Sequence, residues 1–362
     1  MIILYISHLS TSIATGLNWS VPASVDAQSK VDEVLWVNMT DKMMEHWKPV
    51  SAHHNIREYG GDLKLQALPE PFKHPDVVVF EGFYYLDDVC FAKVLRKTGV
   101  PYIIVPRSNL TYAALHNHAW LKKKVAHLLF FDSFVKHATA IQYLTKQEAE
   151  DSVGRFNVPY FIIPNGFNTP IEVKTTFTDE GVKAVFIGRL EMFQKGLDFL
   201  LDAITEIKEK LLEAKFHLDI YGPHRFHYEE IGTIIKKRKI DSIVSLKGEV
   251  GGDDKKKVLL DSDLFIMTSR FEGHPMGLIE ALAYGVPCLV TPGSNMLEEI
   301  KETDAGWYCK MSVESIKDAL LRTINEKVKY PQKSKNAQVL ARKYNWDDIA
   351  QKFHKEVINI IG

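Results

Sequence analysis

Two glutamates, Glu272 and Glu280, flank a turn that contains glycine and proline within the segment 268–291. Pro275 predicts that a helix begins directly after it, because proline fits the first turn of a helix. A helix start carries unpaired N–H groups and a partial positive charge, so it binds anions, and Gly277 would let a phosphate approach the backbone. Glu280, expected in the first turn, could accept hydrogen bonds from a vicinal diol such as a ribose. The alternative is that the helix dipole alone favours Glu280 and that Glu272 is a solvated loop charge.

The loop "FIGRLEMFQKG" supplies two cations, Arg189 and Lys195, after a strand that is expected to end at Gly188. A guanidinium binds phosphate in bidentate fashion, and a lysine acts as a mobile point charge. Either residue alone is typical of an ordinary protein surface. Both together, at the end of a strand that faces the turn at Glu272, indicate a site for a pyrophosphate group.

Short Val- and Ile-rich runs alternate with helical patterns along the chain, which predicts parallel sheets covered by helices on both faces. One amphipathic helix is expected over residues 196–211, where apolar residues recur at steps of three and four. In doubly wound sheets ligands lie beyond the carboxyl ends of the strands, and both loops described above are expected there. The expected strands are "IILYIS", "EVLWVN", "DVVVFEG", "YIIVP", "AIQYLT", "YFIIPNG", "KAVFIG", "FHLDIYG", "SIVSLKG", "LFIMTS" and "PCLVT".

The length of 362 residues, with 46% hydrophobic and 25% charged residues, indicates a globular protein of two domains. Residues 165–181 are rich in Gly, Pro, Thr and Asn and lack an apolar period, so we expect them to join the two halves. The predicted fold is α/β, with two doubly wound, Rossmann-like domains at 1–165 and 166–343. The last helical segment, 344–362, is expected to pack back on the first domain.

These loops resemble the signature of glycosyltransferase family 4, the large retaining group 1 glycosyl transferases of the GT-B fold. The matching residues are "GRL" and "KG" of the first loop, "IYGP" at 220–223 and the E-x7-E pair within "EGHPMGLIEALAYGVPCLVT". The resemblance covers nearly all of the second half, whereas in the first half it rests on element order and on landmarks such as "PNG" at 164–166. It implies an acceptor-binding N-terminal domain and a nucleotide-sugar-binding C-terminal domain that face an interdomain cleft.

The resemblance also implies roles for individual residues. Arg189 and Lys195 would bind the diphosphate of the donor, Glu272 the transferred sugar and Glu280 the ribose. Gly277 and Leu278 would offer backbone N–H groups to a phosphate. The full set of residues expected to contact the donor nucleotide is Gly16, Gly188, Gly222, His274, Gly277, Leu278 and Glu280.

In the first half the match to the family is weaker. Gly16 stands where many relatives carry a glycine pair, and an ordinary strand-to-helix turn is the alternative. Where many relatives place a histidine, this chain reads "PRSNL", so Arg107 becomes the fourth catalytic candidate, with a structural arginine as the alternative. His116 and His118 come later in the chain, and His8 and His116 are weaker candidates than Arg107.

The expected reaction moves a hexosyl group from a nucleoside-diphosphate sugar, with a UDP-sugar favoured, to a saccharide acceptor. The resemblance suggests a lipid-linked acceptor in surface polysaccharide synthesis. No cofactor and no obligatory metal are expected, because Asp263 of the "DSD" at 261–263 leads a strand and basic residues can offset the diphosphate charge. The alternatives are a sugar-nucleotide 2-epimerase of the same fold and a non-catalytic protein that binds sugar nucleotides.

The net charge of −1 gives no overall attraction to nucleic acid. The N-terminus lacks a basic region and a cleavage site, which favours a cytoplasmic protein. The segment 118–138 joins Lys122, Lys123 and Lys124 to aromatic and leucine residues, so it could contact an anionic membrane at its inner face. The alternative is a buried helix with a basic outer end. Of the three cysteines, Cys288 and Cys309 are expected to be reduced core thiols.

Overall fold

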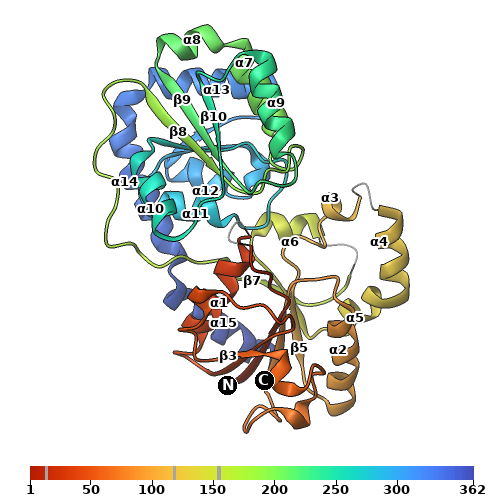
Figure 1. Cartoon of the computed structure of the whole chain (residues 1–362). Coiled ribbons are helices and arrows are strands. Elements are labelled where there is room, and N and C mark those ends of the chain that lie inside the picture. The colour runs from red at the N-terminus through yellow and green to blue at the C-terminus, as the bar shows by residue number, and fades with distance from the viewer. Residues whose placement is uncertain (13–14, 117–119, 153–155) are drawn as a thin grey trace. The chain divides into compact units, whose positions relative to one another are not determined.

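A computed structural model describes residues 1–12, 15–116, 120–152 and 156–362. The chain forms two compact units, each built around a parallel sheet of its own (Figure 1). The first unit contains Met1–Ser12, Leu17–Gly166 and Trp346–Gly362, and the second contains Ile13–Gly16 and Phe167–Asn345.

The sheet of the first unit has seven parallel strands in the order β3-β2-β1-β4-β5-β6-β7. Every residue of the central strand β4 is buried, as expected for a Val-rich strand covered on both faces. Ser7 at the end of β1 pairs with Asn38 of β2 and with Glu81 of β4, so these strands end at one edge. The strands are β1 (Ile2–Ser7), β2 (Glu33–Asn38), β3 (His53–Asn55), β4 (Val77–Glu81), β5 (Tyr102–Val105), β6 (Ala140–Tyr143) and β7 (Tyr160–Ile162).

Helices cover both faces of this sheet, with α1 and α15 on one face and α2 and α5 on the other (Figure 1). The C-terminal helix α15 joins the core through Phe353, whose ring lies 6.2 Å from that of Tyr5 and 6.1 Å from that of Phe161. The helices are α1 (Leu17–Gln28), α2 (Leu86–Thr98), α3 (Tyr112–Leu115), α4 (Trp120–Ala126), the π-helical turn η4 (His127–Phe131), α5 (Asp132–Lys136), α6 (Lys146–Ser152), α15 (Trp346–Ile361) and the 3-10 turns η1 (Glu45–Trp47), η2 (Ile56–Tyr59) and η3 (Leu65–Ala67).

The sheet of the second unit has six parallel strands in the order β10-β9-β8-β11-β12-β13. Successive side chains along a strand point to opposite faces of this sheet. In β11, Leu264 and Ile266 pack with α7, α9 and α13 on one face, and Phe265 between them faces α11 on the other. The strands are β8 (Val182–Ile187), β9 (Phe216–Tyr221), β10 (Val244–Lys247), β11 (Leu264–Met267), β12 (Cys288–Val290) and β13 (Gly306–Tyr308).

Most helices of the second unit connect one strand to the next parallel strand, as βαβ units require. The helices are α7 (Leu197–Glu206), α8 (Lys208–Glu213), α9 (Tyr228–Arg238), α10 (Gly252–Asp261), α11 (Met276–Ala283), α12 (Leu297–Glu302), α13 (Val313–Asn325), α14 (Tyr330–Ala341) and the 3-10 turns η5 (Pro292–Ser294), η6 (Lys327–Lys329) and η7 (Arg342–Tyr344).

The predicted α/β class with two doubly wound sheets is confirmed. The structure differs from the prediction at two short strands and at one helix. The short edge strands β3 and β13 were not predicted. The helix expected over 196–211 is divided into α7 and α8, because Ile207 takes φ −114° and ψ 19°, outside the helical range. Cys288 and Cys309 are buried free thiols, as predicted, and burial raises the pKa of Cys309 to about 12.

Candidate active site

The carboxyl ends of β8 and β11 bring the predicted cation and carboxylate of the second unit together. Lys195 Nζ lies 2.6 Å from Glu272 Oε1, and both side chains are buried. Ser269 Oγ donates a second hydrogen bond, of 2.5 Å, to the same oxygen. Both charges of a buried ion pair have lost their hydration, so each depends on its partner for compensation. A charge-balanced centre therefore lies at the edge of the sheet where the sequence predicts the diphosphate and the sugar.

Helix α11 begins at Met276, directly after Pro275, as predicted. The N–H groups of Met276 and Gly277 form no hydrogen bond within the described residues, so they remain available to an anion. The N–H of Leu278, which was also expected to face the donor, donates to the carbonyl of Pro275 at 3.1 Å. Two backbone donors, at Met276 and Gly277, are therefore free at the start of α11.

Gly277 is needed first for packing. A Cβ at this position would lie 3.2 Å from the carbonyl oxygen of Ile187 and 3.4 Å from the ring of Phe265. The start of α11 thus sits directly on the end of β8, and this close contact places the free N–H groups beside the loop that carries Arg189 and Lys195.

Glu280 lies in the second turn of α11, and not in the first turn as expected, because it is the fifth residue of a helix that starts at Met276. The residue is 8% exposed, and its carboxylate forms an ion pair with Lys255 of α10. Burial and the nearby Glu280 carboxylate raise the pKa of Tyr284. Sequence reasoning missed Lys255, although it belongs to a lysine run at the start of the helix that follows β10, where a ligand-binding cation is expected.

Arg189 is held by a hydrogen bond within the loop after β8. Its Nη2 donates to Gln194 Oε1 at 3.3 Å, and Gln194 in turn donates to the carbonyl of Phe271 at 3.3 Å. Asn295 Nδ2 donates to the carbonyl of Glu272 at 2.5 Å. The Gln194 bond ties the loop after β8, which carries Arg189, to the loop after β11, and the Asn295 bond ties the segment after β12 to that same loop.

Cations and carboxylates lie together at this edge. Arg189, Lys195 and Lys255 accompany Glu191, Glu272 and Glu280, and the two free N–H groups of α11 add partial positive charge. Ammonium, guanidinium and helix-start N–H groups are the donors that suit an anion such as a diphosphate.

Gly222 and His274, which were also predicted to contact the donor, lie in packed positions of the second unit. A Cβ on Gly222 would lie 2.5 Å from Leu190 Cγ and 2.6 Å from the carbonyl oxygen of Gly188, so the ends of β8 and β9 are in direct contact there. His274 is buried, with its ring 4.9 Å from that of Tyr344. Gly16, directly before α1, groups by its contacts with the second unit.

Arg107 lies in the first unit, where its guanidinium is committed to protein partners. It donates to Glu81 Oε2 at 2.7 and 3.0 Å, to Asn165 Oδ1 at 2.7 Å and to Ser20 Oγ at 3.2 Å. Arg107 and Ser108 both adopt positive φ, 51° and 66°, a conformation that costs energy outside glycine and gathers at functional sites. These contacts favour a positioning role for Arg107 over direct contact with a reacting group.

The histidines of the first unit are arranged differently from Arg107. His116 is exposed and stacks on Tyr112 with ring centroids 4.0 Å apart, and His118 lies outside the described residues. His8, directly after β1, bonds Asp88 through Nε2 at 2.8 Å and stacks on Tyr85 at 3.7 Å. Burial raises the pKa of Asp88, and the His8 contact opposes that rise. His8 and Arg107 therefore both mark the carboxyl edge of the first sheet.

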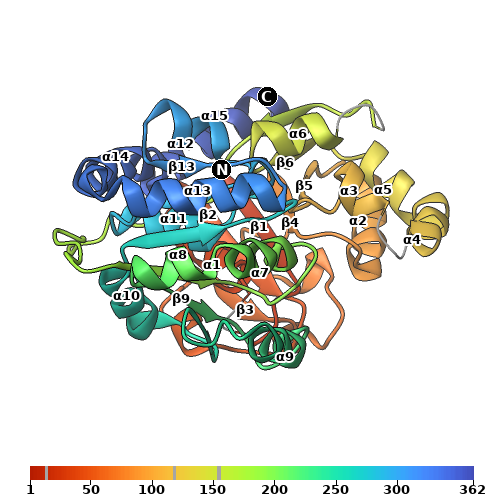
Figure 2. The same ribbon diagram turned by 90° about the horizontal axis from the view of Figure 1, so that it is seen from above.

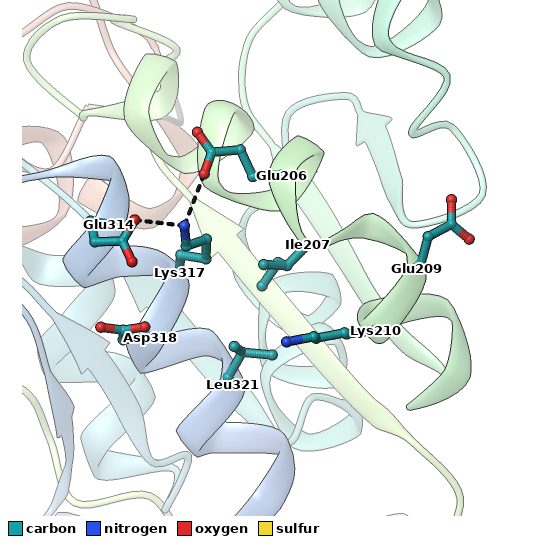
Figure 3. Close-up of a pocket in the computed structure, with 8 residues that line it drawn as sticks. All are labelled: Glu206, Ile207, Glu209, Lys210, Glu314, Lys317, Asp318 and Leu321. Atoms are coloured by element: carbon teal, nitrogen blue, oxygen red, sulfur yellow. Dashed lines mark hydrogen bonds and ion pairs between the residues drawn. The ribbon is translucent and has the colours of Figure 1, made fainter.

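Two other features stand apart from this site. Asp263 lies at the amino end of β11, where its carboxylate accepts the N–H of Lys183 at 3.0 Å and pairs with Lys174 at 3.3 Å. These partners account for the carboxylate as a structural group. A surface pocket of about 450 Å³ lies between α7–α8 and α13, where Lys317 bridges Glu206 and Glu314 (Figure 3).

Comparison with known proteins identifies the family. The sequence profile described as "Glycosyl transferases group 1" matches residues 168–350, just over half of the chain. Mannosylfructose-phosphate synthase of Agrobacterium fabrum is 31% identical over 124 residues, which cover 33% of this chain and 27% of that protein. The aligned parts cover only 27% to 45% of the length of the first four curated relatives.

Two solved structures share the fold over the whole chain. Sucrose-phosphate synthase from Thermosynechococcus elongatus has a TM-score of 0.78 at 14% identity and covers 99% of both chains. HepE from Anabaena, in complex with UDP and glucose, has a TM-score of 0.74 at 15% identity and covers 99% of this chain and 100% of its own. The two parallel sheets are thus those of the GT-B fold. By the match over residues 168–350, the chain belongs to the group 1 glycosyl transferases.

Proposed function

We propose that this chain transfers a hexosyl group from a nucleoside-diphosphate sugar to a hydroxyl of a saccharide acceptor. The observation that carries the proposal is the presence of Arg189, Lys195 and Lys255 in the loops around the start of α11, where the N–H groups of Met276 and Gly277 are free. Guanidinium, ammonium and helix-start N–H groups are the donors that bind phosphate in proteins. A UDP-sugar is the favoured donor, in keeping with the UDP and glucose bound by the HepE structure.

Lys195 and Glu272 exchange partners in this proposal. Without donor they satisfy each other at 2.6 Å. When donor binds, the ammonium turns to the diphosphate and the carboxylate is released to accept hydrogen bonds from hydroxyls of the transferred sugar. Glu280, with Lys255 at its side, accepts hydrogen bonds from the ribose diol.

Catalysis then rests on stabilising the charge that develops on the departing diphosphate. Loss of one preorganised donor to such a charge typically costs ~2.7 to 4 kcal/mol of barrier. The donors around α11 are charged or fixed by the backbone, so no obligatory metal is required. Transfer proceeds with retention at the anomeric carbon, the diphosphate itself assisting deprotonation of the acceptor, and no side chain acts as nucleophile.

The first unit provides the acceptor side. Its sheet ends in a polar edge where Arg107 is held by Glu81 and Asn165, and where His8 is held by Asp88. Such fixed polar groups suit the hydroxyls of a saccharide. The proposed acceptor is lipid-linked, in the synthesis of a surface polysaccharide or glycoconjugate, and the chain acts at the inner face of the membrane. The described residues include no helix long and apolar enough to cross a bilayer.

The test begins with thermal-shift measurements against UDP-, GDP- and ADP-sugars. A ligand at ~100 times its Kd stabilises a protein by ~2.7 kcal/mol, which is easily detected. The stabilising donor is then incubated with and without saccharide acceptors, and the anomeric configuration of the product is read by NMR. Transfer with retention supports the proposal. An epimerised sugar nucleotide formed without acceptor would identify an epimerase, and binding without any product across the acceptors would identify a non-catalytic protein.

A further inference from the structure

An unusual concentration of exposed apolar side chains lies on the first unit. Helix α4 buries none of its residues, although three of its seven are large and apolar. The exposed set continues into the π-helical turn η4, and its members are between 40% and 78% exposed. This set, named the apolar patch, consists of Trp120, Leu121, Val125, Leu128, Leu129 and Phe130. Large apolar side chains gathered on one surface mark an interaction site, whereas single ones are ordinary. The alternative of a buried helix, considered from the sequence, is therefore wrong for α4.

The backbone that carries the apolar patch is anchored to the core at η4. At η4 the chain returns two side chains to the core: His127 is fully buried and bonds Tyr84 Oη at 3.0 Å, and Phe131 packs 5.2 Å from the ring of Phe83. Between them, Leu128, Leu129 and Phe130 all point outward within one π-helical turn. Helix α4, which carries the first half of the patch, lies at the periphery of its unit in both Figure 1 and Figure 2. The buried side chains of His127 and Phe131 thus fix the backbone on either side of the three exposed ones.

Basic charge accompanies the patch. Between Trp120 and Phe131 the sequence has three lysines and no acidic residue, although the whole chain has a net charge of −1. Lys123 turns inward and donates to the carbonyl of Ala114 at 2.5 Å. Lys122 and Lys124 are exposed and form no ion pair with any residue that the structure describes. Two free cations therefore border the apolar side chains.

We propose that the apolar patch docks this chain on the surface of an anionic phospholipid bilayer. Tryptophan, leucine and phenylalanine enter the boundary between headgroups and acyl chains, and exposed lysines meet the anionic headgroups. A protein partner fits less well, because the centres of protein interfaces are depleted in lysine. The inference rests on the proposed function only for its consequence: it brings the acceptor-binding unit to a lipid-linked saccharide.

The test is co-sedimentation of the full chain with vesicles, either of phosphatidylcholine alone or of equimolar phosphatidylcholine and phosphatidylglycerol. The first variant, Leu128→Ser with Leu129→Ser, removes apolar contact, and the second, Lys122→Glu with Lys124→Glu, reverses the charge. Each is expected to lower the partition into the anionic vesicles at least about tenfold. Phosphatidylcholine vesicles should hold the wild type at least about tenfold more weakly than the anionic ones.

Matched controls come from exposed residues of the second unit. Ile171→Ser with Val328→Ser removes apolar side chains that are 107% and 88% exposed, and Lys236→Glu with Lys237→Glu repeats the charge reversal on α9. Both controls should bind the anionic vesicles like the wild type.

Three outcomes would overturn the inference: a wild type that stays out of the anionic pellet, patch variants that pellet like the wild type, or controls that lose as much binding as the patch variants. Patch variants that alter self-association in sedimentation equilibrium, with unchanged vesicle binding, would assign the patch to a second copy of this chain. Nucleotide binding, measured by calorimetry with UDP alone, reports separately on the proposed function, because no patch residue belongs to the donor site.

Discussion

Replacement of Lys195 by methionine should destabilise the second unit as well as lower the rate of transfer. The substitution keeps an unbranched apolar side chain out to Cε but leaves Glu272 as a buried carboxylate without its cation. Breaking one partner of a buried pair typically costs ~3 to 5 kcal/mol. Ser269 still donates to Glu272, so we expect the lower end, about 3 kcal/mol. For a unit of this size that corresponds to a fall of roughly 6 to 12 °C in Tm.

The double variant Lys195→Met with Glu272→Gln separates stability from catalysis. With both charges removed, no buried charge lacks a partner, and the double variant should recover most of the lost Tm. Transfer should stay at least about a hundredfold below wild type in both variants, because the donor to the diphosphate is missing. Differential scanning calorimetry measures the first quantity, and kcat/KM with the identified donor measures the second.

The reasoning on this pair would be refuted by a Lys195→Met variant that melts within about 2 °C of wild type, which would correspond to less than ~1 kcal/mol. A double variant that melts no higher than the single variant would refute it equally, because the two charges would then be independent.

Three further predictions concern other residues. Gly222→Ala should lower the free energy of unfolding by ~1 to 3 kcal/mol or more, because the new Cβ would lie 2.5 Å from Leu190 Cγ; urea unfolding checks this. Glu280→Ala should reduce transfer at least about tenfold and raise the KM for donor, with Glu298→Ala on the exposed face of α12 as the control. Burial lowers the pKa of His53, so the folded state binds fewer protons than the unfolded state, and stability should fall as pH drops through about 6.5; His53→Phe should flatten this dependence in Tm measured from pH 8 to 5.

The fold could be predicted largely from the sequence because its central strands carry an unbroken apolar signal. All five residues of β4 are buried, and the run that forms it reads as a covered parallel strand. The edge strands gave no such signal: β3 reads His-His-Asn, and its pairing with β2 depends on the neighbouring strand. The break between α7 and α8 at Ile207 was equally hidden, because the apolar period continues through it.

The candidate site was predictable in composition but not in pairing. The loop types, together with the rule that ligands lie at the carboxyl ends of strands, predict that Arg189 and Lys195 lie near the start of α11. That Lys195 bonds Glu272, 77 residues away in the chain, and that Lys255 bonds Glu280 follow only from the folded structure. The hydrogen bond from the Leu278 N–H to the carbonyl of Pro275, which leaves the N–H groups of Met276 and Gly277 free, likewise follows only from the folded structure.

The central claim is that the cations and free N–H groups around α11 bind a diphosphate. Isothermal titration calorimetry of UDP, GDP and ADP, each compared with its nucleoside monophosphate, tests the claim whichever base the donor carries. We predict that at least one diphosphate binds more than about tenfold tighter than its monophosphate, and that Arg189→Ala removes most of this difference. Equal affinity for diphosphate and monophosphate in every pair, or an Arg189→Ala variant that discriminates like the wild type, would contradict the claim.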